Sequence, residues 1–153
     1  MIKMDAKFID KKTSITLKGS TKDILADIGS KGDSYEDIVM YLFHQRNILL
    51  ISNYCGSKMF DQEDFSGWVY NCFKDCNIPY PHYYIDDENG EMKPFTDVQI
   101  LDFEAMATDK NIIGEDKIST LTMSEAITNA YCLMYDIFPP TWGIGAMKKL
   151  FAR

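Results

Sequence analysis

The sequence has no long apolar run and few of the residues on which export signals and disulfide frameworks depend. No stretch of about 18 consecutive apolar residues occurs, so we predict no transmembrane helix. The start, Met1–Asp5, has no apolar segment of the kind found in secretory signals. The four cysteines are too scattered for a disulfide framework, and a reducing cytoplasm is therefore the predicted location.

Histidine is scarce, and the common catalytic motifs are missing. A G-x-S-x-G nucleophile motif does not occur, and histidine catalysis would have to use His44 or His82, the only two histidines. His44 shares a helix face with Asp37 and Tyr41, away from the main apolar stripe, and is predicted to be a surface residue. We therefore name no catalytic residue.

Metal-ligating residues form no familiar pattern. Cys72 and Cys76 lie one helical turn apart, but apolar and aromatic residues share their face, and no second ligand pair accompanies them. The acidic segment 86–91 lacks the register of a calcium loop, because Ile85 stands where the first Asp of such a loop belongs. We expect both cysteines in the core, and we expect no metal and no cofactor.

The residues that are present suffice for a folded core. The chain has 153 residues, of which 46% are hydrophobic and 13% aromatic, so we predict one domain spanning 1–153. Helix patterns outnumber strand patterns, and the strands do not alternate with the helices. The predicted class is α+β, with about five to six helices and a small antiparallel sheet that includes a hairpin near 82–95.

Negative charge is concentrated in the middle of the chain. The net charge is −7, but residues 33–136 carry 19 Asp and Glu against six Lys and Arg, a balance of −13. The segments on either side, 1–31 and 137–153, each carry +3. The acidic middle is therefore not expected to bind nucleic acid directly, because contacts with phosphate need Lys and Arg. It favours a basic partner, or it is simply a solvated surface.

Helix signals begin near the N-terminus, after a predicted strand over 13–18. Ser20 and Ser34 are each predicted to cap a helix, and the first helix ends at Gly29. The apolar residues of the second helix recur at helical spacing: Tyr35, Ile38, Val39, Leu42 and Phe43. The apolar run 48–51 either extends this helix or begins a strand, and periodicity does not decide between the two.

The clearest helix is predicted to open at Asp61. Its apolar face is made of Phe65, Trp68, Val69, Cys72, Phe73 and Cys76. A capping box of Thr96 and Gln99 predicts a further helix over about 97–109.

The last third of the chain also has helix signals. A short strand is predicted near 117–121, and a second capping box, Thr122 with Glu125, follows it. The helix that starts there is predicted to end at Pro139-Pro140, and a last short helix begins near 144. The segment 138–143 is predicted to fold Trp142 onto the core rather than to anchor a partner.

Asn89-Gly90 predicts a type I′ hairpin turn, since these residue types supply its two positive φ angles. The register that follows pairs Glu88 with Glu91, Asp87 with Met92, Asp86 with Lys93, and Ile85 with Pro94.

The hairpin tip and one helix start are the predicted binding residues. Tyr and His present apolar bodies with polar tips, as binding surfaces often do. The predicted contacts are Asp86, Asp87, Glu88, Glu91, Tyr83, Tyr84 and His82 at the hairpin, and Asp61, Glu63 and Asp64 at the helix start.

The leading hypothesis is a non-enzymatic acidic protein that engages a basic surface of a partner protein, with a surface that normally holds nucleic acid as one candidate. Such a protein would act as an inhibitor, and a phage or another mobile element would be a fitting source. Two alternatives stay open. One is a small enzyme or ligand-binding domain with a pocket near His82. The other is a structural or assembly subunit, for which a large exposed apolar patch would speak. The sequence does not indicate an oligomeric state.

Overall fold

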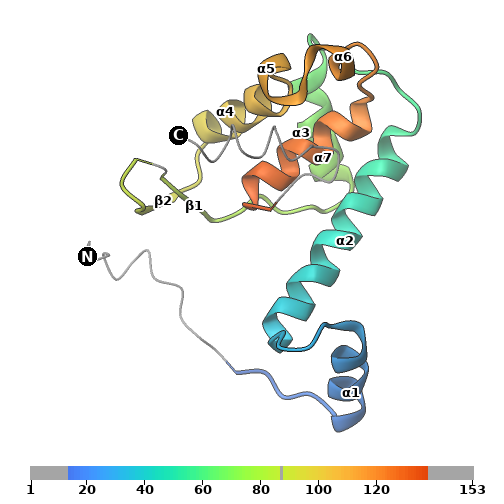
Figure 1. The fold of residues 1–153 in the computed structure, drawn as a ribbon, viewed down its shortest axis with the longest axis vertical. Helices are drawn as coiled ribbons and strands as arrows, with labels where there is room; N and C mark the ends of the chain where they lie inside the picture. Colours follow the sequence, from blue (N-terminus) through green and yellow to red (C-terminus); the bar gives the residue numbers. More distant parts are fainter. Residues whose placement is uncertain (1–13, 87, 138–153) are drawn as a thin grey trace.

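The computed structural model describes residues 14–86 and 88–137 (Figure 1). Seven helices and two strands occur in these residues: α1 (Gly19–Ile28), α2 (Tyr35–Cys55), α3 (Phe65–Asp75), β1 (Tyr83–Ile85), β2 (Met92–Pro94), α4 (Asp97–Ala107), α5 (Lys110–Ile113), α6 (Glu115–Ile118) and α7 (Met123–Met134). The two strands pair antiparallel, which confirms the predicted α+β class. The helix count in the described part exceeds the prediction because α5 and α6, of four residues each, carry too little periodicity to be recognised.

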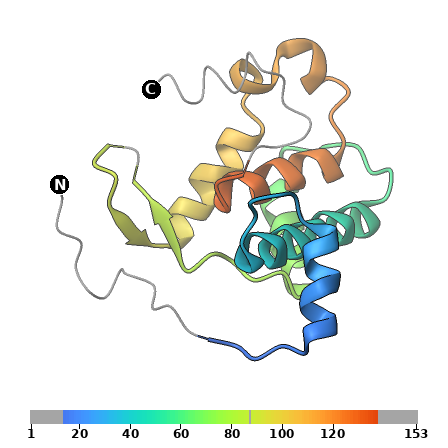
Figure 2. The same cartoon turned by 60° about the horizontal axis from the view of Figure 1, so that its bottom comes forward.

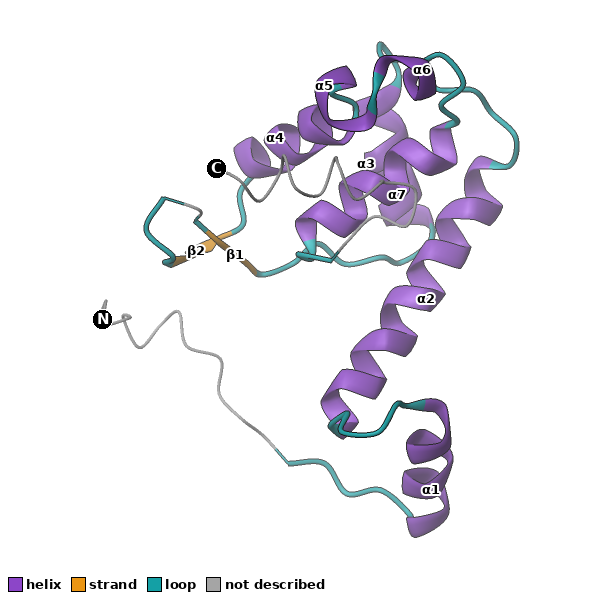
Figure 3. Cartoon of the chain, viewed as in Figure 1, coloured by secondary structure: helices purple, strands orange, loops and turns teal. Residues whose placement is uncertain are grey.

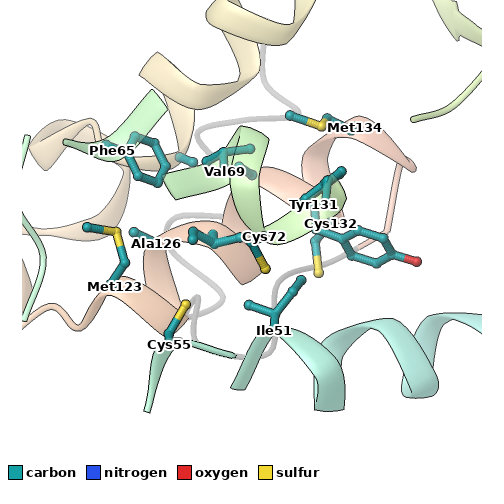
Figure 4. Packing of buried hydrophobic residues seen from close by; sticks show 14 of the residues in the cluster. Ile51, Cys55, Phe65, Val69, Cys72, Met123, Ala126, Tyr131, Cys132 and Met134 are labelled. Atoms are coloured by element: carbon teal, nitrogen blue, oxygen red, sulfur yellow. The ribbon is translucent and has the colours of Figure 1, made fainter. Parts of the chain in front are cut away.

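The core is built around α7, which packs against α2, α3 and α4 (Figures 1 and 3). Ten of its twelve residues are buried. Ala126 and Ala130 are fully buried, and such small side chains let neighbouring helices come close. Val69 and Cys72 of α3 and Ile51 of α2 meet α7 in this cluster (Figure 4). The helical body therefore rests on one almost completely buried helix.

The longest helix, α2, extends beyond this body. Its C-terminal half lies against α3 and α7, whereas its N-terminal half runs outward and meets α1 (Figures 1 and 2). Helix α1 has no buried residue. At the junction, Ile38 is buried and lies so close to Gly29 that a Cβ atom on Gly29 would stand 2.6 Å from Ile38 Cγ1. Helices α1 and the first half of α2 thus form a two-helix arm.

Three of the four predicted helix caps are confirmed. Ser34 and Asp37 form a capping box on α2, and Thr122 and Glu125 form another on α7. The side chain of Thr96 accepts a hydrogen bond from the Gln99 backbone N–H at the start of α4. These side chains satisfy backbone donors that the first helical turn leaves unpaired.

The predicted cap at Ser20 is wrong, because α1 already begins at Gly19 and its preceding residue, Lys18, makes no side-chain cap. The clearest predicted helix also begins later than Asp61. Its first helical residue is Phe65, because Asp61 turns its carboxylate to the Glu63 backbone N–H, a local bond that competes with helix formation.

The sequence misplaced two strands. Residues 14–18 form no strand, because no other described segment pairs with them. The segment predicted as a strand near 117–121 instead holds the end of α6, and only an isolated bridge between Met59 and Thr122 follows it. The ambiguous run 48–51 is helical and belongs to α2. The predicted helix stop at Pro139-Pro140, the segment 138–143 and the helix near 144 lie outside the described residues.

Candidate binding surface

The predicted hairpin forms, but its register differs from the prediction by two residues. The paired residues are Tyr83 with Pro94, Tyr84 with Lys93 and Ile85 with Met92. Gly90 has a φ of +70°, but Asn89 does not have a positive φ. A type I′ turn needs positive φ at both positions, so the chain uses a wider loop.

Local hydrogen bonds explain the wider loop. The Asp86 carbonyl accepts from Gly90 N at 2.7 Å, and Asp86 N donates to the Glu91 carbonyl at 2.8 Å. Two side chains add bonds to the loop backbone: Asp86 Oδ1 accepts from Glu88 N, and Asn89 Oδ1 accepts from Glu91 N. Asp and Asn commonly make such bonds two residues ahead, and here they outweigh the preference of Asn-Gly for a tight turn.

Part of the hairpin's negative charge is already neutralised. Lys93 Nζ lies 2.5 Å from Asp86 Oδ2. This hydrogen bond, together with one from the Glu88 backbone, lowers the pKa of Asp86. Glu88 is exposed and Glu91 is half-buried, while Asp87 lies outside the described residues. The Asp86 carboxylate is therefore used within the hairpin, and Glu88 is the better candidate for a partner contact.

The tyrosines of the hairpin pack against the protein more than they face the solvent. Tyr84 contacts Phe95 edge to face, with ring centroids 6.1 Å apart, and Phe95 stacks on Phe103 of α4. Tyr83 and Tyr84 are half-buried, whereas His82 is exposed. The His82 ring has no hydrogen bond to any described residue. The geometry thus leaves only His82 of the predicted aromatic cluster open to solvent.

The other predicted acids lie on a loop that we call the acidic loop, residues 61–64. Asp61, Glu63 and Asp64 are all exposed. Asp64 precedes α3 without making a side-chain cap, and none of the three carboxylates takes part in an ion pair within residues 14–86 and 88–137. The fold therefore uses little of their charge.

Two backbone hydrogen bonds hold the segment before the acidic loop in place. Phe60 N donates to the Leu121 carbonyl at 3.0 Å, and Met123 N donates to the Lys58 carbonyl at 2.9 Å. These bonds place the acidic loop beside the turn between α6 and α7. Glu115 and Asp116 are exposed acids in the first turn of α6, a few residues before that turn in the sequence.

The structure does not bring the two predicted acidic sets together. The acidic loop precedes α3, and the hairpin follows the segment after its C-terminal end. Figures 1 and 2 both show the hairpin on the opposite side of the molecule from the connection between α2 and α3. The sequence could not show this separation, because it gives no direction for the loops that leave each end of α3.

A polar cluster that the sequence reasoning missed joins α2 to α7. His44 Nδ1 lies 2.5 Å from the Tyr131 hydroxyl, and Asn47 Nδ2 donates to the same hydroxyl at 3.0 Å. Arg46 donates in turn to Asn47 Oδ1 at 2.6 Å. Asn47 and Tyr131 are fully buried.

The predicted surface position of His44 is therefore wrong. Its ring is half-buried and makes edge contacts with Tyr131 and Tyr135. Burial lowers the pKa of His44 and so favours its neutral ring, whose Nδ1, in the tautomer protonated at Nε2, accepts a hydrogen bond from the Tyr131 hydroxyl. Burial raises the pKa of Tyr131, which keeps its hydroxyl protonated as the donor. The burial of His44 could have been predicted from helical spacing. Positions 44, 47, 51 and 55 lie on one side of α2, the side that faces the body, and Ile51 and Cys55 are apolar.

The cysteines lie where the sequence predicted or close to it. Cys72 is buried in the core, and Cys76 is half-buried at the end of α3. Burial of Cys132 raises its pKa to about 12, so the thiol stays protonated and behaves as a small apolar group. Within the described ranges, no three His, Cys, Asp or Glu side chains come together as a metal ion would require.

None of the described helices is both long enough and apolar enough to cross a membrane. No family model, curated protein sequence or solved structure matches this chain significantly.

Proposed function

We propose that this chain is a non-enzymatic binding protein whose acidic loop engages a basic surface of a partner protein. The observation that carries the proposal is the set of three exposed carboxylates at Asp61, Glu63 and Asp64, which the fold leaves without an ion pair in its described part. Asp61 makes a local hydrogen bond with the Glu63 backbone N–H, but none of the three has an ion pair within the described residues that would neutralise its charge. Their charge is available to attract Lys and Arg of another molecule.

The hairpin contributes less to this proposal than its composition suggested. Asp86 is paired with Lys93, and Tyr84 packs against Phe95. Glu88 and His82 remain exposed on the opposite side of the molecule. One globular partner of ordinary size covers about 800 Å² of each surface. A single contact of that size centred on the acidic loop therefore leaves the hairpin free.

A photo-crosslinking experiment tests this assignment. A photoreactive phenylalanine analogue is placed at Gln62, in the middle of the acidic loop, and in separate variants at Asn89 in the hairpin and at Val98 on α4, all of which are exposed. Each variant is irradiated in lysate of the source organism, and crosslinked proteins are identified by mass spectrometry. We expect one basic protein to be captured from Gln62 and not from Val98. Capture from Asn89 alone would move the site to the hairpin and contradict the proposal.

The captured partner then allows a matched charge test. We expect the triple variant D61N/E63Q/D64N to weaken binding of the purified partner by about threefold to about a hundredfold, because each lost charge contact contributes a few tenths to 1 kcal/mol at an exposed site. The variant E88Q/E91Q removes charge from the hairpin and should leave the affinity within about twofold. Equal losses in both variants would mean that overall charge, rather than the acidic loop, attracts the partner.

A further inference from the structure

The exposed side of α2 carries an apolar stripe that no described part of the chain covers. Tyr35, Val39, Leu42 and Leu49 have exposed fractions of 46%, 43%, 37% and 62%. The sequence predicted the first three of these, together with Ile38 and Phe43, as an apolar helix face; Ile38 is buried and Phe43 half-buried, whereas the other three stay exposed.

These residues fall into a regular pattern. The positions Tyr35, Val39, Leu42, Arg46, Leu49 and Asn53 follow one another at alternating steps of four and three, and we call them the α2 seam. All six are exposed. Alternating four-three spacing is the repeat that keeps one helix face against a partner helix in a coiled coil. The side of α2 that faces the body uses other positions, His44, Asn47, Ile51 and Cys55.

The chemistry of α2 fits a protein contact better than a solvated surface. Between Ile38 and Cys55 the only residue among Asp, Glu, Lys and Arg is Arg46. Its guanidinium donates to Asn47 Oδ1, with a longer contact of 3.4 Å to the Cys76 carbonyl, and is thereby held toward the body. The methylene stem of Arg46 can then cover apolar surface within the seam. Interface centres are depleted in acids and Lys and enriched in aromatic residues, Met and Arg.

The occupant that this spacing accommodates best is the same seam on a second copy. When two α2 helices run antiparallel and cross at residue 44, their seam positions align without a gap. Tyr35 then meets Asn53, Leu42 meets Arg46, and Val39 meets Leu49, each contact occurring twice by symmetry. Both Val39–Leu49 contacts are apolar, and Leu42 lies against the Arg46 stem.

The contact would run along most of α2. The seam spans about 27 Å of helix at 1.5 Å per residue. In this register the first half of each α2 lies along the C-terminal half of the partner's α2, so each α1, on which Ile24 and Ile28 are exposed, would lie at one end of the contact. Two-fold dimers are the commonest soluble oligomers.

We infer that the α2 seam, Tyr35, Val39, Leu42, Arg46, Leu49 and Asn53, is the antiparallel dimer contact of this protein with a second copy of itself. The inference is independent of the proposed function, since the seam and the acidic loop use different residues. It would make the protein self-associating, which is one form of the assembly role that the sequence left open.

Sedimentation equilibrium of the full chain tests the inference. We expect the apparent mass to rise with concentration from one chain toward two. The double variant V39D/L49D should remain monomeric at all concentrations, because it places four carboxylates in the shared seam. The control V98D/L101D changes two exposed apolar residues of α4 and should dimerise like the unchanged protein. Circular dichroism checks that both variants keep their helices, as expected for exposed positions.

Disulfide trapping tests the direction of the helices. Chains carrying V39C are mixed with chains carrying L49C under mild oxidation, and we expect the mixed disulfide to exceed either homodisulfide. A V39C homodisulfide in excess would indicate parallel helices and overturn the register. A full chain that stays monomeric, or a dimer unaffected by V39D/L49D, would overturn the inference itself and would mean that another part of the chain or another protein covers the seam.

Discussion

At the scale of single residues, burial shifts the pKa of two side chains, lowering that of His44 and raising that of Glu104. His44 is half-buried against Tyr131, whereas the other histidine, His82, is exposed. Glu104 is only 5% exposed and holds a hydrogen bond from Ser66 Oγ at 2.7 Å. The two buried groups shift stability in opposite directions with pH, and each can be tested separately.

His44 makes stability depend on pH near its ordinary pKa. Burial lowers its pKa in the folded chain below the ordinary 6.5, so the unfolded chain binds the proton more readily. The stabilising contribution is therefore fully present above about pH 6.5 and is lost as the pH falls. We expect the free energy of unfolding, measured with urea, to fall below pH 6.5 less steeply in H44Q than in the unchanged protein. An unaltered slope in H44Q would contradict the assignment.

The effect of Glu104 on the pH dependence of stability has the opposite sign to that of His44. Burial raises its pKa above the ordinary 4.5, and the hydrogen bond from Ser66 only partly offsets this. Its contribution is present below pH 4.5 and is lost as the pH rises, because the carboxylate must ionise in a buried site.

We therefore expect E104Q to raise the free energy of unfolding at pH 7 by about 1 kcal/mol, since the amide oxygen can still accept from Ser66 without carrying charge. The control D102N alters an exposed acid on the same helix and should change stability by less than about 0.5 kcal/mol. A loss of stability in E104Q at pH 7 would show that the ionised carboxylate has a favourable partner.

At the scale of helices and strands, the sequence predicted helices well where capping residues and apolar spacing agreed. The caps at Ser34, Thr96 and Thr122 placed the starts of α2, α4 and α7. Where side chains bond to nearby backbone instead, as Asp61 and Asp86 do, the boundaries and the hairpin register were wrong. Such local bonds depend on the loop conformation, which periodicity does not determine.

The candidate site was predictable only in part. The exposure of Asp61, Glu63 and Asp64 followed from their polarity, but their distance from the hairpin did not. The contact between His44 and Tyr131, 87 positions apart in the chain, arises from the packing of α2 on α7. No pattern within either helix alone specifies that packing, and so the polar cluster could not be predicted.

Two glycines give a matched test of the helix assignments. Gly67 lies inside α3, and a Cβ atom there would meet nothing within 4 Å. We expect G67A to raise the free energy of unfolding by about 0.5–1 kcal/mol, because glycine in a helix costs more backbone entropy than alanine. G29A should instead lower it, because its Cβ would stand 2.6 Å from Ile38 at the junction of α1 and α2. Urea unfolding measures both, and a loss in G67A would contradict the helical placement.

At the scale of the whole molecule, charge and apolar surface lie on different parts. The acidic loop adjoins the turn between α6 and α7, whereas the α2 seam lies on the helix that projects from the body (Figure 1). A dimer formed through the seam would carry two acidic loops. Such a dimer could bind a partner with two basic sites more tightly than a single chain, since the second contact becomes intramolecular.

The dependence of partner affinity on salt tests the central claim, that the acidic loop attracts a basic protein surface. The measurement is the dissociation constant of the purified, crosslink-identified partner, obtained by titration at several concentrations of sodium chloride. We predict that affinity falls by about tenfold or more as ionic strength rises from about 0.05 M to about 0.5 M, because exposed charges are screened. The fall should be shallower in D61N/E63Q/D64N. An affinity that stays constant over this range would contradict the electrostatic account.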